Sequence, residues 1–398
     1  MYFYPIKDPV MPISSKSNLW IPKQLMHYYC RLTFILTTTL FIISCSKPLY
    51  KFPYSESIIP SKKRVAFTIT SNPQDSLHIL YLGCGHMVIT RKGESIMTDP
   101  FVSTQKLIQT GLGQIKLNRE AYKKFEDIVQ AQQVDLKSVK SVWIAHSHYD
   151  HMMDLPVMME RQVFDPSAVI YGNAFADKIL TNFLKPGSYP YHVIQPSETY
   201  CQSCSTQQQH WFKAAPNIRI MPIHSDHAAH VKFLSFNIHL MQGRLKENYF
   251  RDNYTSLNKP TKANQWREGC TYSFLVDFME DDVISFRMFI QTSASNFPLG
   301  SPPEELIRQH PVDLAVLCAA STNNVNVYPK KIMDHIGAKK LLLVHWEDFF
   351  NKALEFDDPR LVRFTQYKKV AKRLGQWNTN VKDDVLMPRP GTMITIKY

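Results

Sequence analysis

One strand-like run that ends in a cluster of histidines constrains the possible fold and function of this chain more than any other feature. The apolar run SVWIA at 141–145 leads directly into HSHYDH at 146–151. Successive side chains of a strand point to opposite faces of a sheet, so these polar residues can converge only where the chain leaves the strand and turns. The sequence therefore predicts a buried strand followed by a loop that carries chemistry.

The composition is that of a folded protein, with one large core or two modest ones. The chain has 398 residues, of which 44% are hydrophobic and 20% are charged, and this profile excludes general disorder. The formal net charge of +12 is spread along the chain, with short basic runs at 62–64 and 368–373. Solvated faces explain such runs as well as an anionic partner does. We expect no nucleic-acid partner.

The N-terminal 1–45 has the features of an extension and a bacterial lipoprotein signal. The apolar run at 32–43 follows Arg31; it is too short to span a bilayer but has the length of a secretory-signal core. The run ends in IISC, which resembles a lipobox, so we expect lipidation at Cys45. Met26 is the candidate true start. A short buried helix is the alternative; the lipoprotein reading predicts a membrane-anchored protein of the cell envelope, on its periplasmic or surface side.

The rest of the chain divides into a tether, one domain and an insertion. Residues 46–75 are rich in Pro, Ser and Lys, as a tether would be. We expect a single folded domain at 76–398, interrupted by a polar insertion at 231–268 that would serve as a lid or docking loop. The pair Cys201 and Cys204 would form a local disulfide, a redox pair or a loop detail; a zinc ribbon would require a second CxxC.

Strand-like runs and helical spacings alternate within this domain, which predicts an α/β (α+β) fold of two layered halves. The expected strands are 77–90, 93–101, 141–145, 168–172, 218–224, 271–278, 284–292, 312–320, 340–346 and 392–398. The expected helices are 118–133, 174–184, 303–310, 328–336 and 359–376.

The histidine cluster has the residue types and spacing of a metal site. On a loop, His146 and His148 can bind one cation. Asp150 and His151, one turn further on, can face a second metal position beside it. Imidazole and carboxylate suit zinc, with manganese or iron as alternatives. We expect one or two ions.

Further ligands must come from elsewhere in the fold, because a tetrahedral site that keeps a water needs three protein ligands. Two later apolar runs end on histidine, at His224 and at His345. We favour His224 because it directly follows the strand; its neighbours His227 and His230 could contact substrate or replace it.

These features resemble the metallo-β-lactamase superfamily, from about Leu77 to the C-terminus. The resemblance rests on HxHxDH and on the two later strand-end histidines. It implies a four-layer αβ/βα sandwich with a dinuclear site at one edge of the two sheets. The closing HW and the opening LG..G and TDP are most similar to the branch that includes L-ascorbate 6-phosphate lactonase and N-acyl phosphatidylethanolamine phospholipase D.

The resemblance also implies ligand assignments. The first metal would be held by His146, His148 and His224, and the second by Asp150, His151 and His345. The family bridges its metals with a strand-end aspartate, but the equivalent segment reads FIQTSAS and places Gln291 there. A neutral amide coordinates weakly, so the second site should be looser or empty.

The expected function is that of a metal-dependent hydrolase acting on a phosphodiester, lactone or amide. The metal would lower the pKa of a water, which attacks carbon or phosphorus, and Asp150 would orient that water or take its proton. Asp99 is either a partner of a ligand histidine or a turn carboxylate. The anchor, the phospholipase in the similar branch and the apolar residues after the site favour a phosphodiester or lipid-derived substrate over other small molecules. The methionines at 152–159 would pack a helix beneath the site or line an apolar substrate pocket. The alternative is a non-catalytic metal- or ligand-binding lipoprotein.

Overall fold

A computed structural model gives the structure of most of the chain. The described residues are 47–48, 52, 65–69, 74–185, 187–204, 208–229, 231–233, 236–238, 259–320, 322–350, 360–363, 365–378 and 380–398. The predicted signal, Met26 and Cys45 lie outside them, as do His230 and much of the insertion, so the predicted lipid anchor stays a prediction. No helix in the described part has the length and apolarity needed to cross a membrane.

An eight-stranded sheet forms from the first half of the chain and its C-terminal end. Its order is β2-β19-β3-β4-β5-β6-β7-β8. The C-terminal strand lies parallel to β2 and antiparallel to β3. The bounds are β2 (Val65–Thr68), β3 (Ser76–Gly83), β4 (His86–Arg91), β5 (Glu94–Thr98), β6 (Val139–Trp143), β7 (Val169–Gly172), β8 (Tyr191–Val193) and β19 (Thr392–Lys397).

A seven-stranded sheet forms from the second half, in the order β18-β16-β15-β14-β13-β10-β9. Its strands are β9 (Phe212–Ala215), β10 (Ile218–Ser225), β13 (Thr271–Glu280), β14 (Val283–Gln291), β15 (Leu314–Cys318), β16 (Lys340–Val344) and β18 (Val385–Leu386). Two small sheets pair β1 (Lys47–Pro48) with β17 (Arg360–Leu361), and β11 (Val231–Phe233) with β12 (Phe236–Ile238).

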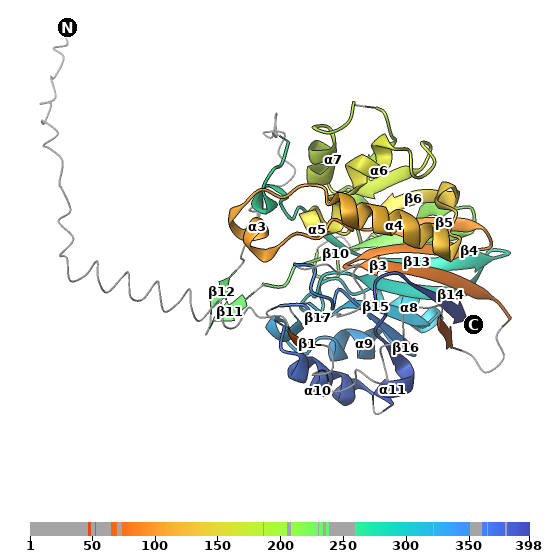
Figure 1. Ribbon diagram of the computed structural model, residues 1–398. Coiled ribbons are helices and arrows are strands. Elements are labelled where there is room, and N and C mark those ends of the chain that lie inside the picture. The colour runs from red at the N-terminus through yellow and green to blue at the C-terminus, as the bar shows by residue number, and fades with distance from the viewer. Residues whose placement is uncertain are drawn as a thin grey trace, which may run out of the picture. The chain divides into compact units, whose positions relative to one another are not determined.

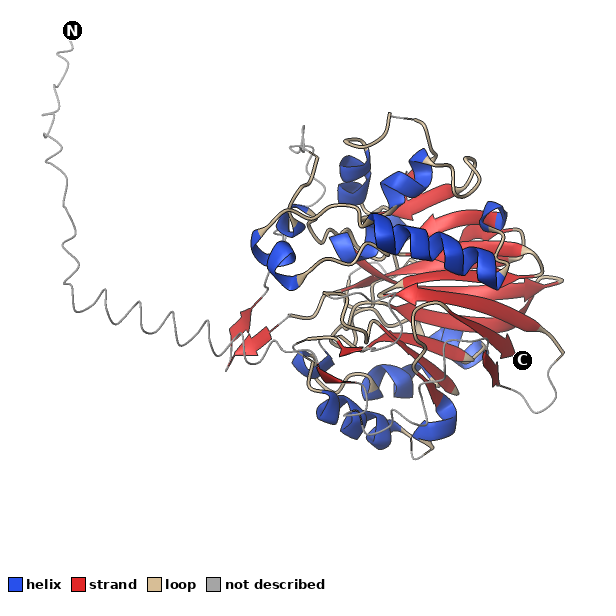
Figure 2. Ribbon diagram, in the orientation of Figure 1, coloured by secondary structure: helices blue, strands red, loops and turns tan. Residues whose placement is uncertain are grey.

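Helices cover the outer faces of both sheets (Figures 1 and 2). One set is α3 (Leu107–Leu112), α4 (Arg119–Gln132), α5 (Tyr149–Met152), α6 (Leu155–Glu160) and α7 (Ala174–Leu180). The other set is α8 (Glu304–Gln309), α9 (Lys330–Ile336), α10 (Tyr367–Trp377) and α11 (Val381–Asp384). Short 3-10 turns lie at Leu136–Ser138, Pro196–Glu198, Ala263–Gln265 and Thr322–Asn324. The result is a four-layer αβ/βα sandwich, so the predicted fold class is confirmed.

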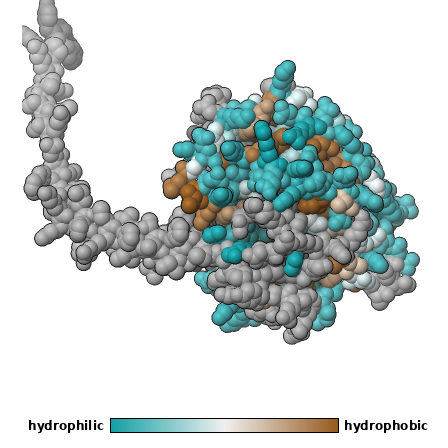
Figure 3. All heavy atoms as spheres, in the orientation of Figure 1, coloured by the Kyte–Doolittle hydropathy of each residue, from teal (hydrophilic) through white to brown (hydrophobic). Residues whose placement is uncertain are grey.

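The strands are buried on both faces, which explains their nearly continuous apolar sequences. Along β3, Ile79 and Tyr81 pack in a core formed by the strands of both sheets, whereas Leu80 and Leu82 pack in a second core with the helices. The outer surface differs: the face in Figure 3 is mostly hydrophilic, with hydrophobic side chains in a few patches. Packing in these two cores fixes the position of one sheet against the other, and therefore fixes which strand ends lie close together.

Most predicted elements are present, but the run 77–90 is two strands instead of one. The chain turns between β3 and β4, where Gly83 (φ +111°) and Cys84 (φ +50°) adopt left-handed conformations. Gly85 packs so closely on Asp99 that a Cβ there would lie 2.2 Å from the carboxylate Oδ2. Because the turn residues are embedded in apolar sequence, the alternation pattern conceals the turn.

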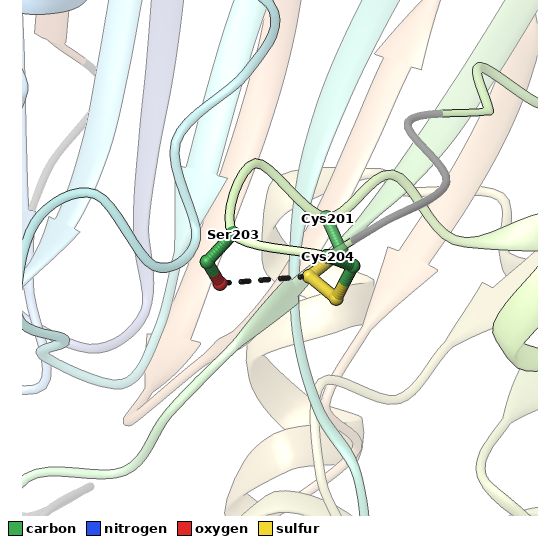
Figure 4. The surroundings of a disulfide bond; sticks show 3 residues. All are labelled: Cys201, Ser203 and Cys204. Carbon is green, nitrogen blue, oxygen red and sulfur yellow. Dashed lines mark hydrogen bonds between the residues drawn. A yellow bond between two sulfur atoms is a disulfide. The ribbon is translucent and has the colours of Figure 1, made fainter.

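Parts of the predicted tether pair with the domain. Within 46–75, β1 pairs with β17 and β2 pairs with β19, and the side chain of Phe52 is buried in the core. The elements that were not predicted are short: β1, β2, β8, β9, β11, β12, β17, β18, α3, α5, α6 and α11. Cys201 and Cys204 form a disulfide, with the Ser203 hydroxyl 3.7 Å from the Cys201 sulfur (Figure 4).

A buried ion pair at the outer side of the second sheet gives the first prediction. Arg287 on β14 donates to Asp277 on β13, with Nε 2.6 Å from Oδ1, and both side chains are buried. We expect Arg287→Ala to destabilise the fold by about 3–5 kcal/mol, because it leaves the carboxylate without its buried partner. Arg219→Ala is the control: Arg219 binds the same carboxylate from a 37% exposed position, so its loss should cost about 1 kcal/mol or less. Urea unfolding measures both; equal losses would contradict this account.

Candidate metal centre

The predicted loop after β6 is where the site forms. His146 is fully buried, and His148 directly precedes helix α5 as its N-terminal cap position. The residue between them is held by two hydrogen bonds: the Ser147 N–H donates to the Glu268 carbonyl at 2.8 Å, and its hydroxyl to Asn173 Oδ1 at 2.8 Å. This fixed loop directs the histidines inward, where a solvent-exposed loop would leave them mobile.

Three histidines form the first ligand group. The ring centroids of His146 and His148 lie 4.6 Å apart, and those of His146 and His227 lie 4.9 Å apart. One ring nitrogen from each of the three lies within 4.8 Å of the others. Zinc–nitrogen bonds are about 2.0–2.1 Å long, so a small movement of the side chains would let one ion bind all three.

The structure brings His227, and not His224, to this group. His224 lies within β10, where it pairs with Tyr272 and donates its N–H to the Tyr200 carbonyl at 2.8 Å. The chain leaves the strand only after Ser225, and the following loop carries His227 to the cluster. The sequence favours His224 as the third ligand, whereas the fold places His227 beside His146.

Cys84, Asp150 and His345 form the second ligand group, in which the ligand atoms again lie within 4.8 Å of one another. His345 Nε2 is 3.4 Å from Asp150 Oδ2, and His151 Nε2 is 3.9 Å from the same oxygen. The His151 ring lies between the groups, with its centroid 3.9 Å from that of His146 and 5.5 Å from that of His345. Cys84 was not predicted, because the turn that presents it is hidden in the sequence.

Asp99 accepts hydrogen bonds from three separate segments at this centre. Its Oδ1 accepts from the Ala145 N–H at 2.7 Å, and its Oδ2 accepts from the Thr292 hydroxyl at 2.7 Å and from His151 Nδ1 at 2.9 Å. Of the two sequence interpretations, the contacts fit that of a partner to a ligand histidine. A carboxylate that accepts from Nδ1–H leaves Nε2 with its lone pair for a metal.

Two of the site's groups are held in the protonation states that bind cations. Burial, reinforced by the neighbouring imidazoles, lowers the pKa of His146 well below its usual value. Burial alone would raise the pKa of Asp150, but the hydrogen bond from His345 and nearby positive charge bring it well below its usual value. A neutral imidazole and an ionised carboxylate are the ligand forms that metals require.

Unpaired buried atoms support a cation at this place. Among the described residues, both ring nitrogens of His146 and Nδ1 of His345 are buried without a hydrogen-bond partner. Buried polar atoms are nearly always satisfied, so unpaired nitrogens on members of both ligand groups fit a site that binds a cation. The donor set of imidazole, carboxylate and thiol suits zinc.

Gln291 lies outside the pocket lining, and its Oε1 is buried without a hydrogen-bond partner among the described residues. Its side chain lies over Gly300, with Nε2 3.5 Å from Ser225 Oγ, and the pocket beside the histidines is lined by the residues that follow it, Thr292, Ser293 and Ala294. The segment FIQTSAS contains no Asp or Glu. The expected carboxylate is therefore missing whichever residue takes the bridging position.

One pocket opens onto both ligand groups, and it includes His148, Asp150, His227 and His345. Its empty space, including the open solvent at its mouth, is about 830 Å³. The methionines at 152–159 pack in the core instead of lining this pocket. The rest of the lining is Tyr149, Ala228, Ala263, Thr292, Ser293, Ala294, Cys318, Ala320, Phe349, Phe350, Val362 and Arg363.

Comparisons with known proteins give likenesses of structure alone. No protein-family model and no curated protein matches the sequence. Similar solved structures include a novel metallo hydrolase, Igni18, from Ignicoccus hospitalis, at 13% identity, with 81% of this chain and 99% of that chain covered and a TM-score of 0.45. They include the metallo-beta-lactamase fold protein YhfI from Bacillus subtilis, at 13% identity, 80% and 98% coverage and a TM-score of 0.44. A third is an isothiocyanate hydrolase from Delia radicum gut bacteria, at 10% identity, 79% and 98% coverage and a TM-score of 0.42.

Proposed function

We propose that this protein is a metal-dependent hydrolase whose favoured substrate is a phosphodiester with an apolar group, such as a lipid-derived one. The observation that carries the proposal is that the two ligand groups, His146/His148/His227 and Cys84/Asp150/His345, border a single pocket. A structural zinc site is closed by four protein ligands, whereas three ligands facing a pocket leave a position for water or substrate.

The chemistry divides between the ion and the protein. A bound dication would supply an acidified water and would draw charge from the substrate oxygen. Asp150 lies in the pocket wall as an ionised carboxylate, which can orient a water or accept its proton. Ser293 lines the same wall and offers a hydroxyl group to the substrate.

The lining favours an anionic substrate with an apolar part. Phe349, Phe350 and Val362 form an apolar wall, and Arg363 adds a guanidinium group to the lining. That group is held by Asp348, with Nε 3.2 Å from Oδ2, and its positive charge suits an anionic phosphate group. Lactones and amides are neutral and would gain less from this arginine. A lipid anchor at Cys45, which the sequence predicts, would tether the pocket to a membrane surface.

Turnover of a small panel tests the proposal. Zinc-loaded protein should hydrolyse a bis-aryl phosphodiester faster than a lactone or a β-lactam, and chelation should abolish turnover until zinc is returned. The chelated protein is the control for metal-independent hydrolysis. Tightly bound metal with no turnover of any panel member would favour the non-catalytic binding protein instead, and turnover that survives chelation would exclude the metal-dependent mechanism.

A further inference from the structure

The turn between β3 and β4 offers the second metal position an anionic ligand. We propose that Cys84 binds that metal through its sulfur, together with Asp150 and His345, and supplies the negative charge that the FIQTSAS segment lacks. This inference deepens the proposed metal centre and does not depend on which substrate is hydrolysed.

The position of the Cys84 sulfur is the first observation that supports this proposal. The Cys84 sulfur and one ligand atom each from Asp150 and His345 lie within 4.8 Å of one another, and all three side chains are buried or nearly so. The side chains come from three separate places: the β3–β4 turn, the loop after β6 and the end of β16. Convergence of a thiol, a carboxylate and an imidazole from three elements is the pattern of a zinc site.

Backbone conformation is the second observation. Cys84 has φ +50° and His345 has φ +55°, although neither is the glycine that this left-handed region favours. Unfavourable conformations of this kind persist where the surrounding structure imposes them, and they gather at functional sites. Here they occur at two of the three members of one ligand group.

A buried network imposes the two conformations. The Glu347 carboxylate accepts hydrogen bonds from the Cys84 N–H and from the Tyr81 hydroxyl, the latter at 2.7 Å. The Tyr81 hydroxyl in turn accepts from the His345 N–H at 3.0 Å. One tyrosine and one glutamate therefore tie the backbones of Cys84 and His345 to each other, which holds their side chains at a fixed separation before any ion binds.

The charge and the chemical softness of the three ligand atoms determine which metal ion this group would prefer. The thiol would release its proton to solvent as the sulfur–metal bond forms, so a thiolate and the Asp150 carboxylate together balance one dication. Thiolate is a soft ligand that favours zinc over manganese or magnesium. Cys318, which lines the pocket, directs its sulfur at the Ala320 carbonyl, 3.5 Å away, and is outside the ligand group.

Cobalt substitution tests the proposal by a signal that needs no turnover. Full-length protein loaded with Co²⁺ should show a near-ultraviolet thiolate-to-cobalt charge-transfer band. The band should be lost in Cys84→Ser and kept in Cys318→Ser, while visible cobalt bands from the all-histidine group remain in both. Cobalt bound without the charge-transfer band, or a band lost with Cys318 instead, overturns the assignment to Cys84 but leaves the metal centre intact. Absence of cobalt binding overturns both.

Zinc X-ray absorption of the unmutated protein covers the case in which Cys84→Ser does not fold. The proposal requires a sulfur neighbour at about 2.3 Å besides nitrogen and oxygen neighbours at about 2.0–2.2 Å. The sulfur signal should persist in Cys318→Ser. A first shell of nitrogen and oxygen alone would overturn the proposal.

Discussion

Protein in which His146 and His148 are both replaced by alanine is expected to lose its bound metal almost completely. His146 is fully buried, neither of its ring nitrogens has a hydrogen-bond partner among the described residues, and its ring contacts those of His148, His151 and His227. Loss of a single outer partner of a ligand costs about 10–100-fold in metal affinity; loss of two direct ligands should cost more. Competition with a chromophoric chelator measures the affinity, and elemental analysis gives the metal content per chain.

The matched control is His310→Ala. That histidine lies after α8, with Nδ1 2.9 Å from the Pro311 carbonyl, so its loss should leave the metal content unchanged. Thermal unfolding of the double variant checks that it still folds. A double variant that folds and binds metal at the wild-type stoichiometry would contradict the proposed centre.

The sequence predicts the site residues that lie at or just after the end of an apolar run. HSHYDH follows a buried strand directly, so simple strand geometry is enough to place His146, His148 and Asp150 together at a strand end. His345 could be predicted for the same reason, because KLLLV ends one residue before it and forms β16. Parallel β15 and β16 bring that end to the edge of the sheet where the site lies.

The remaining residues depend on details that no local pattern carries. His224 and His227 differ by three positions, and only the length of β10 decides which of them leaves the sheet. Cys84 lies in a turn that is read as strand because apolar residues surround it. The partnership of Asp99 with Thr292 joins residues 193 positions apart. The packing of the two sheets on each other determines all of these contacts. Residues that are distant in the sequence meet there, so no local pattern predicts them.

Asp99→Asn is expected to weaken metal binding at the centre by about 10–100-fold, through His151, whose ring lies between the two ligand groups, while the protein stays folded. The two oxygens of Asp99 accept three hydrogen bonds, from the Ala145 N–H, the Thr292 hydroxyl and His151 Nδ1. An asparagine keeps the shape but has one acceptor oxygen. If its amide N–H faces His151 Nδ1, that nitrogen must become the acceptor, and the ring proton moves to Nε2, where it blocks coordination. Metal titration of the purified variant measures the loss.

Asp154→Asn separates this effect from the general cost of changing a buried carboxylate. Asp154 is as completely buried as Asp99 and also accepts three hydrogen bonds, from the Val102 N–H and from the N–H and hydroxyl of Ser103, but these partners include no histidine. Both variants should lose stability because each leaves buried donors poorly satisfied. Only Asp99→Asn should lose metal affinity. Equal metal affinity in the two variants would show that Asp99 supports the fold without setting the tautomer of His151.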